Sequence, residues 1–290
     1  MREGGLDGPE TKLLRNDITS GSAVKIQANG ITLGYNDRGE GPPLVFLHAF
    51  PLNRTMWAQQ EEALSSRFRV ITIDLRGHGE SDAPAWRYSL EQYAADVKEL
   101  LDHLGVAKSV FVGLSMGGYL EFALYRQFPQ LVRGLVFADT RAEADKPEQR
   151  KWRFDLAQRT AAVGPSAVID DMLSKLLSSK AYERQPALVE RVKSIQAAAP
   201  VQGIIGDLMA MAERPDSTGL LDSIAVPVLV IVGEDDVLTP PADAERIARG
   251  IRGARLVTIP GAGHLSNMEQ PALFNRALEE FAAGLSAAKG

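Results

Sequence analysis

The 290-residue sequence contains no cysteine. This absence excludes disulfide bonds, thiolate-bound metals and a cysteine nucleophile, and it is compatible with the cytoplasmic location that we expect. An excess of basic residues is also missing, because 32 Lys and Arg stand against 37 Asp and Glu, which gives a formal net charge of −5. Nucleic-acid binding depends on positive side chains that neutralise phosphates. We therefore expect no nucleic-acid partner.

Long hydrophobic runs are absent as well. The longest, such as 228–232, have the length of a strand, whereas a membrane-spanning helix needs about 20 apolar residues. Residues 1–22 show neither the apolar stretch of a secretory signal nor any periodicity, and we expect them to form a disordered or loosely docked extension. The sequence thus predicts a soluble protein without a membrane partner, and it leaves the oligomeric state open.

The sequence does contain a regular alternation of apolar strand-like segments and segments with helical spacing. With 45% apolar residues, the chain can bury one large core. A hairpin signal at Asn29-Gly30 comes first, and helical segments then separate the strand-like segments. These segments cover residues 44–47, 69–73, 109–112, 134–138, 226–232 and 254–259. The pattern predicts an α/β fold with a mostly parallel, doubly wound sheet of about eight strands.

Strand signals disappear between residues 141 and 219. Four helical segments follow one another there, with breaks near Gly164, Pro186 and Pro200. We expect a helical cap over 141–219, inserted into a core formed by 23–140 and 220–290. Such a cap would shelter a pocket at the carboxyl ends of the strands. The alternative is a helical subdomain that packs only against itself.

A serine lies at the end of one predicted strand. The run 110–112 stops at Gly-Leu-Ser-Met-Gly, residues 113–117, and helical spacing follows directly. Ser115 is therefore expected on a sharp turn between strand and helix, where Gly113 and Gly117 leave room for the backbone. A serine hydroxyl is a weak nucleophile, so catalysis would require a base and a third group that orients the base.

This stretch resembles the nucleophile turn of the α/β-hydrolase fold family, in its branch of serine carboxylesterases, cofactor-free haloperoxidases and enol-lactonases. The resemblance implies that Ser115 is the nucleophile and that the acid and the base follow it in that order. Among the four histidines, His264 follows both Ser115 and an acidic loop, so it is the expected base. His103 fits a helix position, His78 a turn, and His48 the loop after the first parallel strand.

The acid is expected in the loop after the strand 226–232. A glycine at 233, an aspartate three residues later and a proline at 240 resemble the acid loop of the family. We therefore assign the acid to Asp236. Asp235 fits a solvated turn residue, and Asp139 remains an alternative because some family members place the acid one strand earlier.

The resemblance also implies two backbone N–H donors for an oxyanion. One belongs to Met116, the residue after the nucleophile. The second belongs to Phe50, because residues 48–51, His-Ala-Phe-Pro, are similar to a His-Gly-Phe-Pro stretch of the family, from which Ala49 departs. The expected substrate pocket is lined by side chains that are equally compatible with core packing, namely Trp57, Met172, Leu176 and Leu208.

These residues together predict a serine hydrolase that cleaves the carboxylic ester of a small to medium apolar molecule through an acyl-enzyme. No cofactor and no metal are expected. A lactone or enol-lactone hydrolase and a perhydrolase or haloperoxidase side activity remain open, since they would use the same groups. A ligand receptor without turnover is the alternative from a different class of protein.

Overall fold

The computed structural model describes residues 24–85 and 87–287, so the extension predicted for 1–22 lies outside it. Within the described residues one eight-stranded sheet has the order β1-β2-β4-β3-β5-β6-β7-β8. The strands are β1 (Val24–Ala28), β2 (Ile31–Arg38), β3 (Pro43–Leu47), β4 (Arg69–Ile73), β5 (Ser109–Leu114), β6 (Val132–Ala138), β7 (Val228–Gly233) and β8 (Arg255–Ile259). β2 pairs antiparallel with β1 and β4, and all other pairs are parallel. The predicted fold class is confirmed.

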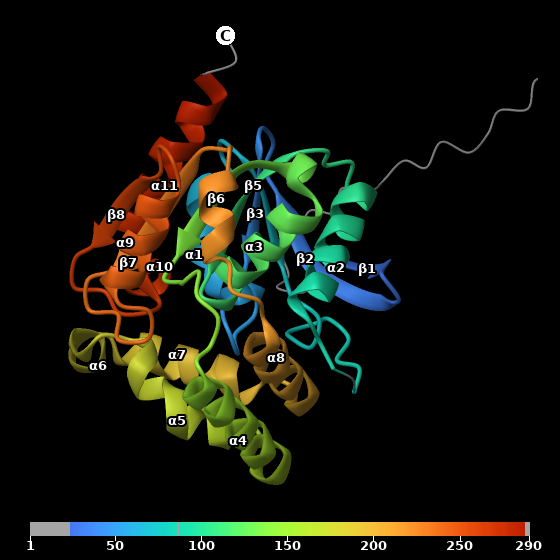
Figure 1. Cartoon of the computed structure of the whole chain (residues 1–290), viewed down its shortest axis with the longest axis vertical. Helices are drawn as coiled ribbons and strands as arrows, with labels where there is room; N and C mark the ends of the chain where they lie inside the picture. Colours follow the sequence, from blue (N-terminus) through green and yellow to red (C-terminus); the bar gives the residue numbers. More distant parts are fainter. Residues whose placement is uncertain (1–23, 86, 288–290) are drawn as a thin grey trace, which may run out of the picture.

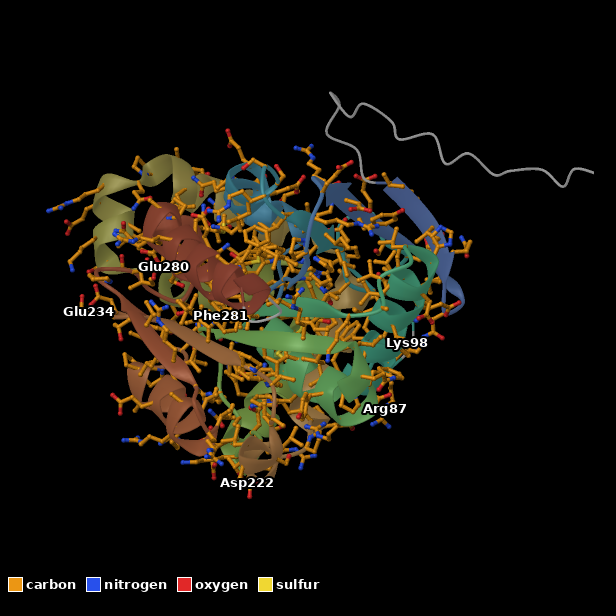
Figure 2. The ribbon with its side chains drawn as sticks, turned by 90° about the horizontal axis from the view of Figure 1, so that it is seen from above. Arg87, Lys98, Asp222, Glu234, Glu280 and Phe281 are labelled. Atoms are coloured by element: carbon orange, nitrogen blue, oxygen red, sulfur yellow. The ribbon has the colours of Figure 1, made fainter. Side chains whose placement is uncertain are left out.

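Helices cover both faces of the sheet, as Figures 1 and 2 show: α1 and α11 lie on one face, and α2, α3 and α9 on the other. The helical segments of the core are η1 (Arg54–Trp57), α1 (Ala58–Leu64), α2 (Leu90–His103), α3 (Met116–Gln127), η2 (Pro129–Leu131), η3 (Thr218–Ser223), α9 (Pro241–Gly250), α10 (Ser266–Glu269) and α11 (Pro271–Ala287). Two covered faces explain why β5 and β7 are apolar and buried throughout. Labelled charged residues such as Arg87, Asp222 and Glu234 lie at the rim of the view in Figure 2.

Five helices lie between β6 and β7, within the segment 141–219 predicted as a cap. They are α4 (Pro147–Val163), α5 (Ser166–Leu176), α6 (Ser179–Arg184), α7 (Pro186–Ala197) and α8 (Val201–Glu213). Figure 1 shows them gathered at one end of the sheet. The sequence predicted four helical segments because neither Gly nor Pro marks the break between α5 and α6. Ser178 makes that break, since its hydroxyl accepts a hydrogen bond from the N–H of Ala181 at 3.2 Å.

Helix α8 joins the cap to the core through a close backbone approach. A Cβ atom on Gly203 would lie well under 3.0 Å from the backbone of Gly77, in the loop after β4. Next to this contact, Asp207 of α8 receives a hydrogen bond from Tyr93 and pairs with Nε2 of His78 at 2.7 Å. His78, which the sequence placed in a turn, thus holds the cap through a fully buried side chain.

None of the helices in 24–85 and 87–287 combines the length and the apolar composition that a bilayer crossing requires.

The contact at Gly203 predicts the effect of one added methyl group. Gly203→Ala should lower the free energy of unfolding by about 1–3 kcal/mol, because the methyl meets backbone atoms that cannot rotate away. Urea denaturation measures this change. Gly284→Ala is the control: Gly284 lies on the exposed side of α11 with open space around it, so that variant should be unchanged or more stable by up to about 1 kcal/mol. Equal stability of the two variants would contradict the packing.

Candidate active site

Ser115 lies at the carboxyl end of β5, between strand and helix. Its backbone has φ +56° and ψ −109°, a left-handed region that residues other than glycine rarely adopt. Two hydrogen bonds hold it there: the Ser115 N–H donates to the carbonyl of Ala138 at 2.9 Å, and the Thr140 hydroxyl donates to the carbonyl of Ser115 at 2.7 Å. Neighbouring β6 and the residues after it therefore support the turn.

The glycines on either side of Ser115 are required by close packing. A Cβ atom on Gly113 would lie well under 3.0 Å from the backbone of Gly117, and one on Gly117 would lie equally close to the carbonyl oxygen of Leu47 in β3. The pattern around Ser115 is thus explained by the approach of α3 to two strands. Within the described residues, the Ser115 hydroxyl has no hydrogen-bond partner and lines a cavity.

His264 and Asp236 meet at the same end of the sheet. Nδ1 of His264 lies 2.9 Å from Oδ2 of Asp236. The other oxygen of Asp236 accepts the N–H groups of Leu238 at 2.8 Å and Thr239 at 3.0 Å, and the Thr239 hydroxyl donates to Oδ2 at 2.6 Å. Both side chains are buried. A carboxylate fixed in this way holds the imidazole so that Nδ1 carries the proton and Nε2 can accept one.

The two other aspartates considered for this position do not contact His264. Asp235 is exposed and pairs with Lys180 at 3.3 Å. Asp139 is fully buried, accepts the N–H of Gly233 at 2.7 Å and receives a hydrogen bond from the hydroxyl of Ser266. The structure therefore places Asp236, and neither alternative, against the imidazole.

The electrostatics of the two buried aspartates differ. Burial by itself would raise the pKa of Asp236, but the charge of His264 and the hydrogen bonds from His264 and Thr239 hold this pKa below its ordinary value. Burial and the neighbouring Asp236 charge raise the pKa of Asp139 well above its ordinary value. At neutral pH, Asp236 is thus the ionised partner of the imidazole.

The loop that carries His264 is attached to the cap. The Glu269 carboxylate accepts the N–H of Gly263 at 2.8 Å and, from the turn between α5 and α6, the Ser178 hydroxyl at 2.6 Å. The N–H of Leu265 donates to the carbonyl of Leu176 at 3.0 Å. Cap and core therefore fix the backbone on both sides of the imidazole.

Ser115 and His264 open into one cavity of about 600 Å³, part of which is open solvent. Core and cap both contribute to its walls, which consist of Phe50, Ser115, Tyr119, Arg141, Asp145, Gln149, Trp152, Arg153, Met172, Met211, Leu238, Thr239 and His264.

The predicted pocket residues fall into two groups. Met172 lines the cavity. Trp57 does not, because it is fully buried between Phe46 and Phe274, with ring centroids 5.1 and 6.0 Å away. Leu176 and Leu208 are likewise fully buried outside the cavity wall.

Several lining residues were not predicted. Thr239 falls inside the acid loop, so the spacing that identified Asp236 could have included it. The polar residues of α4, Gln149 and Arg153, carry no such signal, because one polar side chain on a cap helix looks like any other solvated one. Only the folded arrangement places them in the wall of the cavity that Ser115 also lines.

The expected oxyanion donors lie beside the cavity. Met116 is the first residue of α3, so its N–H has no partner inside the helix and lies at the positive end of the helix dipole. Phe50 lies in the loop after β3 and lines the cavity.

His48 supports the loop that carries Phe50. Its Nδ1 lies 3.0 Å from the carbonyl of Ala49, and its Nε2 accepts the N–H of Leu75 at 3.0 Å. Burial, followed by the neighbouring His78, lowers the pKa of His48 well below its ordinary value. His48 is therefore neutral at physiological pH and orders this loop.

Residues 42–271 match the model of the alpha/beta hydrolase fold family, and the chain belongs to this family. An esterase from Thermogutta terrifontis, solved with malate bound, is 40% identical, with a TM-score of 0.88 over 91% of this chain and 98% of that one. An enol-lactonase from Burkholderia xenovorans LB400 is 31% identical, with a TM-score of 0.84 over 90% of this chain and 100% of that one. The 3-oxoadipate enol-lactonase 2 of Acinetobacter baylyi is 33% identical over 89% of this chain and 94% of its own length.

Glu121, on the buried side of α3, is a polar residue near Ser115 that the sequence analysis did not single out. One carboxyl oxygen accepts the N–H of Val136 at 3.2 Å and also interacts with the N–H of Gly113. The other has no hydrogen-bond partner among the described residues. Because the group is fully buried, desolvation raises its pKa well above the ordinary value.

This raised pKa predicts a pH dependence of stability. The folded protein holds the Glu121 proton more tightly than the unfolded chain, whose carboxyl titrates at about 4.3. Above that pH, the free energy of unfolding should fall by up to about 1.4 kcal/mol per pH unit until the folded carboxyl ionises. Glu121→Gln cannot ionise and should lack this loss. Urea denaturation between pH 5 and 8 measures the difference.

Glu62→Gln, an exposed change on α1, is the control and should follow the wild type. If Glu121→Gln and the wild type show the same pH dependence, the carboxyl does not titrate as its burial requires.

Proposed function

We propose that this protein is a serine hydrolase that cleaves carboxylic esters through an acyl-enzyme. The observation that carries the proposal is the 2.9 Å contact between Asp236 and Nδ1 of His264, with the imidazole and Ser115 lining the same cavity. Three relatives supply independent support, an esterase at 40% identity and two enol-lactonases at 31% and 33%. All three names describe cleavage of an acyl–oxygen bond.

In the proposed reaction, Ser115 Oγ attacks the ester carbonyl carbon while Nε2 of His264 takes the hydroxyl proton. The tetrahedral intermediate collapses, the alcohol leaves with that proton, and the acyl group remains on Ser115. Water then repeats the sequence and releases the acid. Asp236 keeps its negative charge throughout and stabilises the imidazolium that forms in each half of the reaction.

The negative charge on the carbonyl oxygen requires donors that are already in place. We assign this role to the backbone N–H groups of Met116 and Phe50. Met116 adds the dipole of α3, and the neutral ring of His48 supports the Phe50 loop without adding a charge of its own.

Proton transfer requires Ser115 Oγ and His264 Nε2 to reach hydrogen-bonding distance. In enzymes without substrate, such catalytic hydrogen bonds are often long and shorten only in the complex. A serine hydroxyl with no competing partner is compatible with that rearrangement.

A lactone or enol-lactone hydrolase is the second candidate, favoured by the two enol-lactonase relatives. The chemistry differs in one respect, because the leaving alcohol stays attached to the acyl group. The identity of 40% to the esterase leads us to put open-chain esters first.

Replacing the nucleophile tests the mechanism. Ser115→Ala should reduce turnover of 4-nitrophenyl butyrate by at least about 10³-fold while the protein stays folded, since only the remaining groups assist water. A fluorophosphonate should label the wild type at Ser115 and leave the variant unlabelled, as read by peptide mass spectrometry.

Ser109→Ala on the same strand is the matched control, because the Ser109 hydroxyl is buried and without a partner among the described residues. Its turnover should equal that of the wild type. Turnover by Ser115→Ala within about tenfold of the wild type would overturn the mechanism. Tight ligand binding with no turnover by the wild type would instead indicate a receptor.

A direct comparison separates the two candidate substrates. We expect kcat/KM for phenyl butyrate to exceed that for dihydrocoumarin, a cyclic ester of a similar phenol, and we expect both activities to disappear in Ser115→Ala. The opposite order of kcat/KM would favour the lactonase. Formation of peracid from acetate and hydrogen peroxide on the same preparation measures any perhydrolase activity.

A further inference from the structure

The cavity wall contains more positive than negative charge, although the whole chain is acidic. Arg153 of α4 and Arg214, which follows α8, both pair with the carboxylate of Asp145, Arg214 at 2.7 Å. The three side chains are only 11%, 3% and 2% exposed. Two guanidinium groups therefore share one carboxylate in a site with little solvent.

A second cluster next to it is balanced. Arg141 lies 3.1 Å from Asp243, and Arg246 pairs with both Asp243 and Glu143. These four side chains carry two positive and two negative charges. These seven side chains thus carry one positive charge in excess, in the group around Asp145, while the exposed carboxylate of Asp216 also interacts with Arg214.

The ionised state of Asp145 supports this count. Burial by itself would raise the pKa of Asp145, but Arg153 and Arg214 hold it below its ordinary value. The carboxylate is therefore charged at neutral pH, and it neutralises one of the two arginines. A buried charge without a partner is costly, so a binding partner for the other arginine would stabilise the site.

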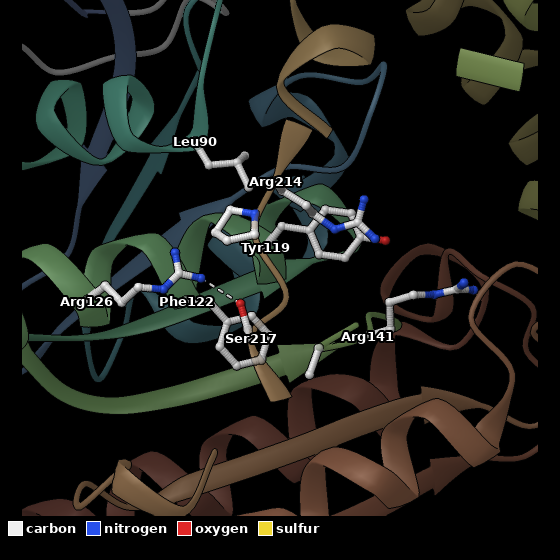
Figure 3. A pocket seen from close by; sticks show the side chains of 9 residues that line it. Leu90, Tyr119, Phe122, Arg126, Arg141, Arg214 and Ser217 are labelled. Carbon is white, nitrogen blue, oxygen red and sulfur yellow. Dashed lines mark hydrogen bonds between the residues drawn. The ribbon is translucent and has the colours of Figure 1, made fainter. Parts of the chain in front are cut away.

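Of these two arginines, Arg214 has its donors satisfied. Besides Asp145, it donates to the carbonyls of Met211 at 2.8 Å and Glu143 at 2.9 Å, and its guanidinium lies 4.1 Å from the ring centre of Tyr119. Figure 3 shows Arg214 next to Tyr119, at the side of a shallow hollow that shares Tyr119 and Arg141 with the cavity.

Arg153 has spare donor capacity and lines the cavity. Its Nη1 meets only the thioether sulfur of Met211, at 3.4 Å, which is a weak acceptor. Its Nη2 lies 3.5 Å from Asp145, at the limit of a hydrogen bond. A carboxylate would offer this guanidinium two strong acceptors in the planar geometry that it prefers.

We propose that the substrate carries a free carboxylate that binds Arg153, at the cap side of the cavity, while its ester group lies at Ser115. The inference rests on the proposed ester hydrolysis and specifies the substrate class. Apolar side chains that line the same cavity, Phe50, Met172, Met211 and Leu238, would surround the part of the molecule between the two groups. The substrate is thus an anionic ester or lactone, in place of the purely apolar one expected from the sequence.

Two esters with the same leaving group test the proposal. 4-Nitrophenyl hydrogen adipate and 4-nitrophenyl hexanoate have acyl chains of equal length, and only the first ends in a carboxylate. We expect Arg153→Gln to lower kcat/KM for the adipate ester by about 10- to 100-fold, mainly through KM, because a charge-assisted hydrogen bond is lost. The hexanoate ester should change by less than about threefold, and Arg153→Lys should restore part of the adipate activity.

A second pair of substrates tests a carboxylate on the alcohol side of the ester. It compares 4-(hexanoyloxy)benzoate, whose leaving phenol carries a carboxylate, with 4-methylphenyl hexanoate, whose leaving phenol is neutral. A selective loss by Arg153→Gln in either pair supports the proposal and tells which side carries the charge. Equal effects on anionic and neutral esters in both pairs would overturn it.

Arg150→Gln is the matched control, since Arg150 lies on the exposed side of the same helix. It should leave all four rates unchanged.

Stability gives a further readout: Arg153→Gln leaves Arg214 and Asp145 as a balanced pair, so the variant should unfold at the same urea concentration as the wild type or higher. A stability loss with parallel losses on all esters would show that Arg153 is only structural. The proposed ester hydrolysis would still stand in that case if the wild type hydrolysed neutral esters and Ser115→Ala did not.

Discussion

The site depends on a backbone contact behind Ser115. Helix α3 approaches β3 so closely that position 117 has room only for hydrogen, and β5 enters the helix through a residue with positive φ. These restraints act on the main chain of Ser115, so they position the serine without engaging its hydroxyl. The hydroxyl can then face the cavity, where the imidazole of His264 is fixed separately by Asp236 and by the loop that Glu269 holds against the cap.

Charge is distributed unevenly among the buried groups around this contact. Asp236 is ionised beside an imidazole, burial and the Asp236 charge raise the pKa of Asp139 well above its ordinary value, and burial lowers the pKa of His48. At one end of the cavity, the Asp236 carboxylate thus pairs with His264. On the cap side, Arg153 and Arg214 share the carboxylate of Asp145. The Asp236–His264 pair and the two arginines around Asp145 belong to separate hydrogen-bond networks. A ligand anion bound at Arg153 therefore does not compete with Asp236 for His264.

The alternation of strands and helices and the serine turn were predictable because each has a local cause, and the acid loop was predicted from its resemblance to the family. Continuous apolar runs indicate covered strands, and the glycines at 113 and 117 indicate close backbone approach. The pocket was less predictable. Trp57, Leu176 and Leu208 are apolar and buried, as their type suggests, but apolarity does not tell whether a side chain faces a cavity or the core. The break before Ser179 was missed because Ser178 is held by Glu269, far along the chain. Arg153 likewise acquires its place only through contacts with Asp145 and Met211.

The attachment of α8 fixes one end of the cap helices against the core. At Gly203 the helix touches the loop after β4 main chain to main chain, and Asp207 is held by two buried side chains, His78 and Tyr93. There is no space on that side for a larger residue, so this junction does not accommodate changes of side-chain size. Changes of ligand preference are better accommodated on α4 and α5, whose Gln149, Arg153 and Met172 line the cavity.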